Sequence, residues 1–221
     1  MADGISHQLA LEEHLAAPGK IIFGTDSHTT TYGAVGALPP ASAIRRWPPS
    51  SAAGGCGSGS SAIKVVVNGP LPKGVFPKDI ILRVLGDLTA AGAIYKSLEF
   101  TGSTIQQLSI SGRAAIANMA VERGQSGPVR PGRKTAAFCG VDLADCDWLR
   151  FDGDARYERV LTYDAGTFRP YLSLRVDNVH PIEDVGTPVD QVFIGSCTNG
   201  RLRIRRGGGS AERTRHRPLS G

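Results

Sequence analysis

The chain has 221 residues, a formal net charge of +5 and 41% apolar residues, enough for a hydrophobic core in one large domain or two small ones. It has no run of about 18 apolar residues and no basic, apolar leader. We therefore expect neither a membrane-spanning segment nor a secretory signal. Its four cysteines are irregularly spaced, unlike a secreted disulfide framework. We therefore expect a cytoplasmic protein that does not interact with membranes.

The positive charge is concentrated at the C-terminal end. Residues 201–221 carry seven Arg and one Glu, a net of +6, so the 200 residues before them carry a net of −1. A short Arg/Gly-rich tail can bind phosphate backbones non-specifically. The body of the protein is nevertheless neutral, and we do not expect a nucleic-acid partner.

The N-terminal region predicts a helix followed by a buried strand. The helix is expected around Gln8–Leu15, and Pro18-Gly19 leads into the apolar run Ile21-Ile22-Phe23. Gly24 ends this run, and the triplet Asp26-Ser27-His28 follows. A short apolar run that ends in Gly is typical of a strand that stops at a turn, where polar groups are held rigidly beside an open cleft. The triplet alone fits a plain turn with an N-cap equally well.

The middle of the chain predicts alternating strands and helices. Lys64–Val67 is expected to be a strand that ends at the turn Asn68-Gly69. Residues 77–86 predict a helix with Pro in its first turn, and its apolar residues share one face: Ile80, Ile81, Val84 and Leu85. Residues 111–124 predict another helix, with Ser111 as N-cap and Gly124 just beyond its end. This alternation indicates an α/β layered fold.

Two stretches lack a periodic pattern. Residues 38–62 contain four prolines, and the tail at 201–221 is rich in Arg and Gly. Both compositions are typical of loops or disorder. We therefore divide the chain into an α/β region over residues 1–200, irregular at 38–62, and a basic, disordered tail at 201–221.

Six separated motifs stand out along the chain. They are Gly4-Ile-Ser-His7, Gly24-Thr-Asp-Ser-His-Thr29 with Thr31-Tyr-Gly33, Lys78-Asp-Ile80, Leu98-Glu-Phe-Thr-Gly102, Asn118-Met-Ala120 with Glu122, and Ile194-Gly-Ser-Cys-Thr-Asn-Gly-Arg201. In this order, over nearly 200 residues, they resemble the aconitase family, most of all the large subunits of 3-isopropylmalate dehydratases and homoaconitases. The resemblance implies part of an α/β/α layered fold with a parallel or mixed sheet.

The resemblance also implies a chemistry. Members of this family hold a [4Fe–4S] cluster through three Cys thiolates, and the open fourth iron acts as a Lewis acid on the substrate. They isomerise a 2-hydroxy di- or tricarboxylic acid by dehydration and rehydration. The resemblance favours 3-isopropylmalate, in leucine biosynthesis, with homocitrate, citrate and methylated malates as alternatives. A small subunit that carries the swivelling domain and its catalytic serine is the expected partner.

Four residues match proton-transfer positions of the family. Asp26 and His7 match one carboxylate–imidazole pair, and Glu99 and His28 match a second. A carboxylate fixes the tautomer of an imidazole and raises its basicity, which suits proton transfer. Without the resemblance, His7 would be interpreted as a histidine on a helix surface and Glu99 as a solvated acid.

Four more residues match ligand positions of the family. Cys197 matches a cluster ligand, although a buried core cysteine is the plain alternative. Ser27, Asn199 and Arg201 match positions that contact the substrate or orient the cluster, and Arg suits a carboxylate because its guanidinium binds with two parallel hydrogen bonds. The remaining cysteines match no ligand position and are interpreted as incidental thiols: Cys56, Cys139 and Cys146.

The sequence also departs from the family pattern. A further Asp–His pair would precede Met1, and no Cys-x-x-Cys with the other two cluster ligands follows Arg201. One thiolate cannot hold a cubane cluster, so we expect the chain to be inactive alone. We hypothesise that residues 38–62 and the tail are frameshift products, which the nucleotide sequence would test. Two other classes of function stay open: a catalytically dead α/β interaction module, and an RNA-binding relative that uses the basic tail.

Overall fold

The computed structural model describes residues 5–39, 61–88, 96–122, 127–146, 148–149, 152–175, 178–186 and 188–191. The expectations for residues 40–60, for Gly124, for the motif at 194–201 and for the tail lie outside these ranges. None of the helices within them is long and apolar enough to cross a membrane.

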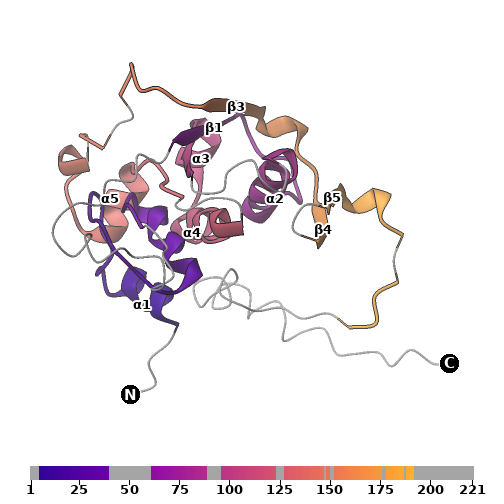
Figure 1. Ribbon diagram of the computed structural model, residues 1–221, viewed down its shortest axis with the longest axis horizontal. Coiled ribbons are helices and arrows are strands. Elements are labelled where there is room, and N and C mark those ends of the chain that lie inside the picture. The colour runs from indigo at the N-terminus through magenta and orange to yellow at the C-terminus, as the bar shows by residue number, and fades with distance from the viewer. Residues whose placement is uncertain are drawn as a thin grey trace.

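The elements alternate between helices and strands (Figure 1). The α-helices are α1 (Ser6–Glu12), α2 (Pro77–Leu88), α3 (Ser103–Gln107), α4 (Ile110–Met119) and α5 (Arg133–Cys139). The strands are β1 (Ala62–Asn68), β2 (Ser97–Thr101), β3 (Arg159–Asp164), β4 (Tyr171–Arg175) and β5 (Asn178–Pro181). The 3-10 helices are η1 (Ser27–Val35), η4 (Ala120–Glu122), η5 (Ala144–Cys146), η6 (Ala165–Thr167) and η7 (Ile182–Asp184).

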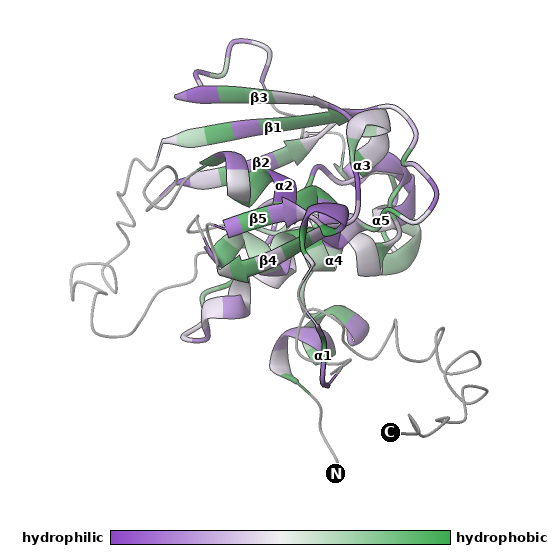
Figure 2. Ribbon diagram, turned by 90° about the vertical axis from the view of Figure 1, so that its right-hand side faces the viewer, coloured by the Kyte–Doolittle hydropathy of each residue, from purple (hydrophilic) through white to green (hydrophobic). Residues whose placement is uncertain are grey.

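Three parallel strands form the main sheet, in the order β2–β1–β3. Residues along β1 alternate between buried and half-buried, so one face of the sheet packs against the core and the other carries Lys64 beside Glu99. A separate antiparallel hairpin joins β4 and β5. Figure 2 shows α2, α4 and the hairpin on the same side of the three-stranded sheet. The expected α/β class is confirmed, and so is the strand that contains Lys64–Val67.

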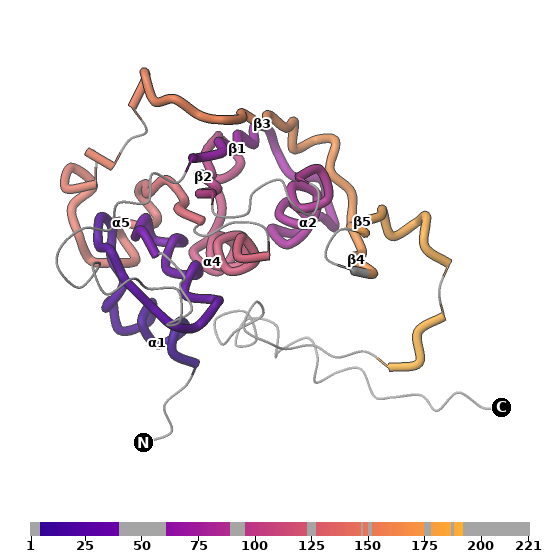
Figure 3. Tube along the Cα trace, viewed as in Figure 1, coloured from indigo at the N-terminus to yellow at the C-terminus, as the bar shows by residue number. Residues whose placement is uncertain are grey.

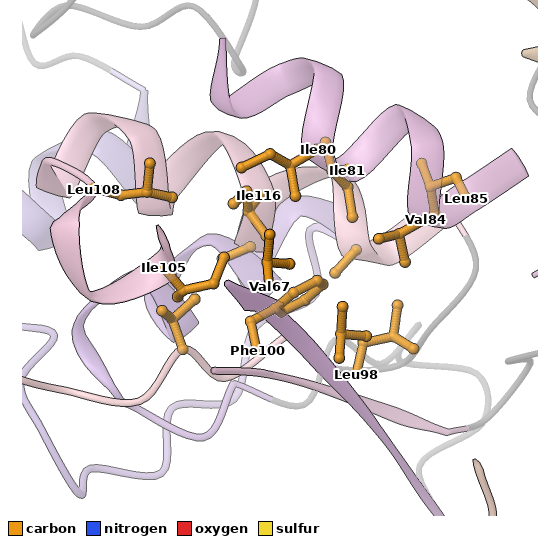
Figure 4. Close-up of a cluster of buried hydrophobic side chains, with 14 of the residues drawn as sticks. Val67, Ile80, Ile81, Val84, Leu85, Leu98, Phe100, Ile105, Leu108 and Ile116 are labelled. Atoms are coloured by element: carbon orange, nitrogen blue, oxygen red, sulfur yellow. The ribbon is translucent and has the colours of Figure 1, made fainter. Parts of the chain in front are cut away.

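The main core lies between the sheet and helices α2 and α4. The four residues predicted on one face of α2 are all at most 1% exposed, which confirms that helix. They meet Phe100 of β2 and Ile116 of α4, both fully buried, and Figure 4 shows these side chains pointing toward one another. Burying each such side chain stabilises the fold by about 1.5–3 kcal/mol.

A second, smaller core holds the N-terminal segment against α4 and α5. It contains Leu11 of α1, Tyr32 and Val35 of η1, Ile110 of α4 and Cys139 of α5. Figure 3 shows the N-terminal segment, in indigo, beside these two helices. Cys139 is a free, buried thiol in this core.

The predicted strand Ile21–Phe23 is wrong. Its backbone makes an isolated parallel bridge between Ile21 and Leu38, and the side chains of Ile21 and Phe23 are 61% and 52% exposed. The helix before it also ends earlier than predicted, at Glu12. His14 has a positive φ of 54°, which a helix cannot contain.

The start of α4 differs by two residues from the prediction. The N-cap is Ser109, whose Oγ accepts a hydrogen bond from the Gly112 amide at 3.2 Å, and Ser111 lies inside the helix. Serine occupies both positions, and the sequence pattern does not distinguish them.

Arg113 of α4 is a fully buried cation among the described residues. Its guanidinium donates hydrogen bonds to the carbonyls of Arg130 and Gln106 at 2.8 and 3.2 Å and to the Thr135 hydroxyl at 3.1 Å. Burial lowers the pKa of Arg113 to about 10. The side chain therefore stays charged at neutral pH and links α4 to α3, to α5 and to the segment that precedes α5.

Backbone contacts attach η1 to the sheet. The Gly33 carbonyl accepts from the Val129 amide at 2.9 Å, and the adjoining segment bonds to Phe100 of β2 through Pro128 and Arg130. A Cβ atom at Gly33 would lie 2.2 Å from the Gly127 carbonyl oxygen. Glycine is therefore required for this approach of two backbones.

Candidate active site

The triplet Asp26-Ser27-His28 forms the start of η1. The Asp26 carboxylate caps this helix, because its Oδ1 accepts from the His28 amide at 2.7 Å. The same oxygen lies 3.7 Å from His28 Nδ1, and Ser27 Oγ lies 3.2 Å from that nitrogen. The plain interpretation of the triplet as a capped turn is therefore correct, and the turn also gathers a carboxylate, a hydroxyl and an imidazole in one place.

His7 lies beside this turn, on the first turn of α1. Its ring centroid is 6.1 Å from that of His28, and its side chain is buried, with neither ring nitrogen hydrogen-bonded to any of the residues that the structure describes. The helix-surface interpretation of His7 is thus wrong. Burial lowers the pKa of His7; the charge of Asp26 raises it and that of His28 lowers it, and the net shift is downward. His7 is therefore a neutral imidazole near neutral pH, within the electrostatic field of Asp26.

Glu99 lies elsewhere, on β2. Its Oε2 accepts a hydrogen bond from the Tyr157 hydroxyl at 3.0 Å, and Lys64 sits over the Tyr157 ring, 5.1 Å from its centroid. Burial raises the pKa of Glu99, which the Tyr157 hydrogen bond and the Lys64 charge partly offset. The structure brings His7, Asp26, Ser27 and His28 together, but the predicted Glu99–His28 pair is not formed in it.

Several residues that support the site were not predicted. Thr29, Thr30 and Thr31 follow the triplet and are buried, and Asn118 of α4 contacts Thr30 and Thr31. Tyr32 is also buried, and burial together with the Asp26 charge raises its pKa. A run of hydroxyl residues next to a turn is a sequence signal for such bonds, but Asn118, which bonds to Thr30 and Thr31, comes from α4, far along the chain.

A cavity of about 480 Å³ lies between α2, η4 and β4. Lys78, Asp79 and Glu122 contribute its charged groups, and Met119 part of its apolar wall. The lining contains none of His7, Asp26 and His28. Glu122 lies at the end of η4, which packs against η1.

The remaining predicted site residues lie outside the described residues: Cys197, Asn199 and Arg201. Within the described ranges, no group of three or more His, Cys, Asp or Glu side chains is placed to hold a metal ion. The described residues therefore do not provide the donor set of an iron–sulfur cluster.

Comparison with known proteins identifies relatives of this chain. A family model described as the aconitase family (aconitate hydratase) matches residues 1–186. A probable methanogen homoaconitase large subunit from Methanosarcina mazei is 41% identical over 208 residues, covering 91% of this chain and 53% of that protein.

Two further relatives are named 3-isopropylmalate dehydratase large subunits. The protein from Heliobacterium modesticaldum is 40% identical over 211 residues, covering 90% of this chain and 49% of its own length. Large subunit 1 from Thermotoga maritima is 41% identical over 226 residues, covering 91% and 50%. The chain thus spans about half the length of the curated relatives it matches.

Proposed function

We propose, since this chain belongs to the aconitase family, that it forms part of the large subunit of an iron–sulfur hydro-lyase. The reaction would isomerise a 2-hydroxy di- or tricarboxylic acid. One observation carries the proposal: the buried, neutral His7 and the Asp26-Ser27-His28 turn lie side by side in a chain about 40% identical to such large subunits.

The two imidazoles are suited to proton transfer in different ways. His7 has an unprotonated nitrogen at neutral pH and lies within the field of Asp26, which stabilises the imidazolium once a proton arrives. In His28, the Ser27 hydroxyl and the Asp26 carboxylate lie next to Nδ1 and fix the orientation of the ring. The other ring nitrogen, Nε2, is therefore the atom at which we place proton exchange. The exposed Ser27 hydroxyl is proposed to contact the substrate.

The cluster of the family would supply Lewis-acid activation of the substrate hydroxyl. Cys197 is proposed as one ligand, and Asn199 and Arg201 as groups that bind substrate carboxylate or orient the cluster. The described residues offer no donor set for it, so we assign no step to it here.

The names of the relatives support two substrate candidates. Two of the three are 3-isopropylmalate dehydratase large subunits, which favours 3-isopropylmalate, and the Methanosarcina relative favours homocitrate as the alternative. The words "large subunit" support a small-subunit partner. A cytoplasmic location is proposed as well, on the irregular spacing of the cysteines.

Because the chain is not expected to be active alone, the test is a hydration assay on this chain extended by the remaining half of one of these relatives. The extended protein is reconstituted anaerobically with iron and sulfide and combined with the small subunit of the same relative. We expect turnover of 3-isopropylmalate or homocitrate and a loss of about a hundredfold in Asp26→Asn and His28→Asn. Asp154→Asn, which changes an exposed carboxylate outside the site, should keep the wild-type rate. A folded protein that turns over neither acid would overturn the proposal.

A further inference from the structure

Three consecutive threonines follow the Asp26-Ser27-His28 turn, and each donates its hydroxyl to a backbone carbonyl. Thr29 donates to Asp26 at 2.7 Å, and Thr31 donates to His28 at 2.6 Å. Thr30 instead donates to Asn118 of α4 at 3.2 Å. Two of the three bonds therefore end on the residues of the triplet, and the third ends on the neighbouring helix.

Thr31 has a second bond that connects it to α4. The Asn118 Nδ2 group donates to Thr31 Oγ1 at 2.8 Å, and both residues are at most 3% exposed. The Thr31 hydroxyl thus accepts one hydrogen bond and donates another, which uses its single proton. Bonds in such a chain polarise and strengthen one another in a buried setting.

We propose that Thr31, held by Asn118, is a positioning residue that fixes the Asp26-Ser27-His28 turn relative to His7. A 3-10 helix has poor hydrogen-bond geometry of its own, and Asp26 and Ser27 are exposed. The bond to the His28 carbonyl fixes the peptide plane after His28, and through it the direction of the His28 side chain.

The simpler alternative is that these hydroxyls only satisfy polar groups where η1 packs on α4. Thr30 offers a direct comparison, because it is equally buried and also donates a hydroxyl, yet its bond ends on Asn118 and not on the triplet. A general packing role predicts the same result for either threonine. A positioning role predicts an effect for Thr31 and none for Thr30.

The experiment compares Thr31→Val, Thr31→Ser and Thr30→Val. Valine keeps the shape of threonine and removes the hydroxyl, whereas serine keeps the hydroxyl. The readout is hydrogen exchange at the His28 amide, which bonds to Asp26 Oδ1. Thr31→Val leaves the His28 carbonyl and the Asn118 side-chain amide without their hydrogen-bond partner. This loss should speed the exchange of the His28 amide by about tenfold. Thr31→Ser should restore slow exchange, and Thr30→Val should leave it unchanged.

A second readout rests on the proposed function. In the reconstituted protein, kcat should fall by about tenfold in Thr31→Val with KM unchanged, and should recover in Thr31→Ser. Equal effects of Thr31→Val and Thr30→Val, or wild-type exchange in Thr31→Val, would overturn the positioning role. If the wild type shows no turnover, the proposed function fails, and the exchange experiment still decides the role of Thr31.

Discussion

Removing the hydroxyl of Tyr157 should destabilise the protein more at neutral pH than in acid. The hydroxyl donates to Glu99 Oε2 at 3.0 Å, and both side chains are half-buried. A hydrogen bond to a charged group contributes about 1.5–3 kcal/mol when buried, and partial exposure reduces this to about 1 kcal/mol. Tyr157→Phe isolates this contribution, because a phenyl ring still lies beneath Lys64.

The pH dependence follows from the pKa of Glu99. Burial raises this pKa above its ordinary value of 4.5, and the Tyr157 hydrogen bond partly lowers it again. A carboxyl with a raised pKa binds protons more tightly in the folded state, so stability falls as the pH rises from 4.5 through the folded pKa. Removing the hydroxyl raises that pKa further and enlarges the loss. Tyr157 itself stays protonated throughout, because burial and Glu99 raise its pKa to about 12.

The assay is urea unfolding of wild type and Tyr157→Phe at about pH 4 and about pH 7. The cost of the substitution should be about 1 kcal/mol at the higher pH and clearly smaller at the lower. In a Glu99→Gln background, where the acceptor is a neutral amide, the cost should be about 0.5 kcal/mol at both. Equal costs in wild type at the two pH values, or a larger cost in acid, would refute this reasoning.

Three further predictions, one of them with a matched control variant, test the fold. Gly102→Ala should lower the free energy of unfolding by more than about 2 kcal/mol, because the φ of Gly102 is 111° and a Cβ would lie 2.2 Å from the Val67 carbonyl oxygen. The matched control is Gly74→Ala, which should cost about 1 kcal/mol, because Gly74 has a φ of 89° but open space around it. Burial lowers the pKa of His7 below 6.5, so the free energy of unfolding of the wild type should fall as the pH drops below that value. In His7→Phe this fall should be smaller, because phenylalanine does not take up a proton. Arg113→Ala should cost about 3 kcal/mol, because three hydrogen bonds of a fully buried cation are lost, one to the buried Thr135 hydroxyl and two to part-buried carbonyls. Urea unfolding measures all three.

Each of these predictions can fail in a distinct way. Similar costs for the two glycine variants would mean that the contact with Val67 relaxes. An acid profile of His7→Phe that matches the wild type would mean that the imidazole is solvated. A neutral effect of Arg113→Ala would mean that the cost of burying the charge outweighs its hydrogen bonds.

Local patterns predicted the central elements of the fold. Pro77 in the first turn and the repeat of Ile80, Ile81, Val84 and Leu85 predicted α2, because burial of one helix face depends on spacing alone. The strand Ile21–Phe23 failed for the opposite reason. A strand needs a neighbour along its length, and apart from the bridge to Leu38 the described residues provide none.

The site was predicted in part for a similar reason. Asp26, Ser27 and His28 are consecutive in sequence, so their proximity follows from the turn. The partner of Glu99 lies 58 residues away in the chain, and Asn118 lies 87 residues from Thr31. Such long-range pairs have no periodic signature, and the resemblance to a family identified residues without giving their contacts in this chain.

The contact of Gly33 with the sheet determines how activity measurements on this protein should be interpreted. Because the backbone of η1 is bonded through Val129 and its neighbours to β2, the Asp26-Ser27-His28 turn has little freedom to unfold while the strands remain intact. The fraction of molecules in which the turn is folded is then thermodynamically coupled to the fraction in which the whole sheet is folded. A substitution deep in the core can lower the measured rate by reducing the fraction of folded molecules, with no change in the chemistry of the molecules that remain folded.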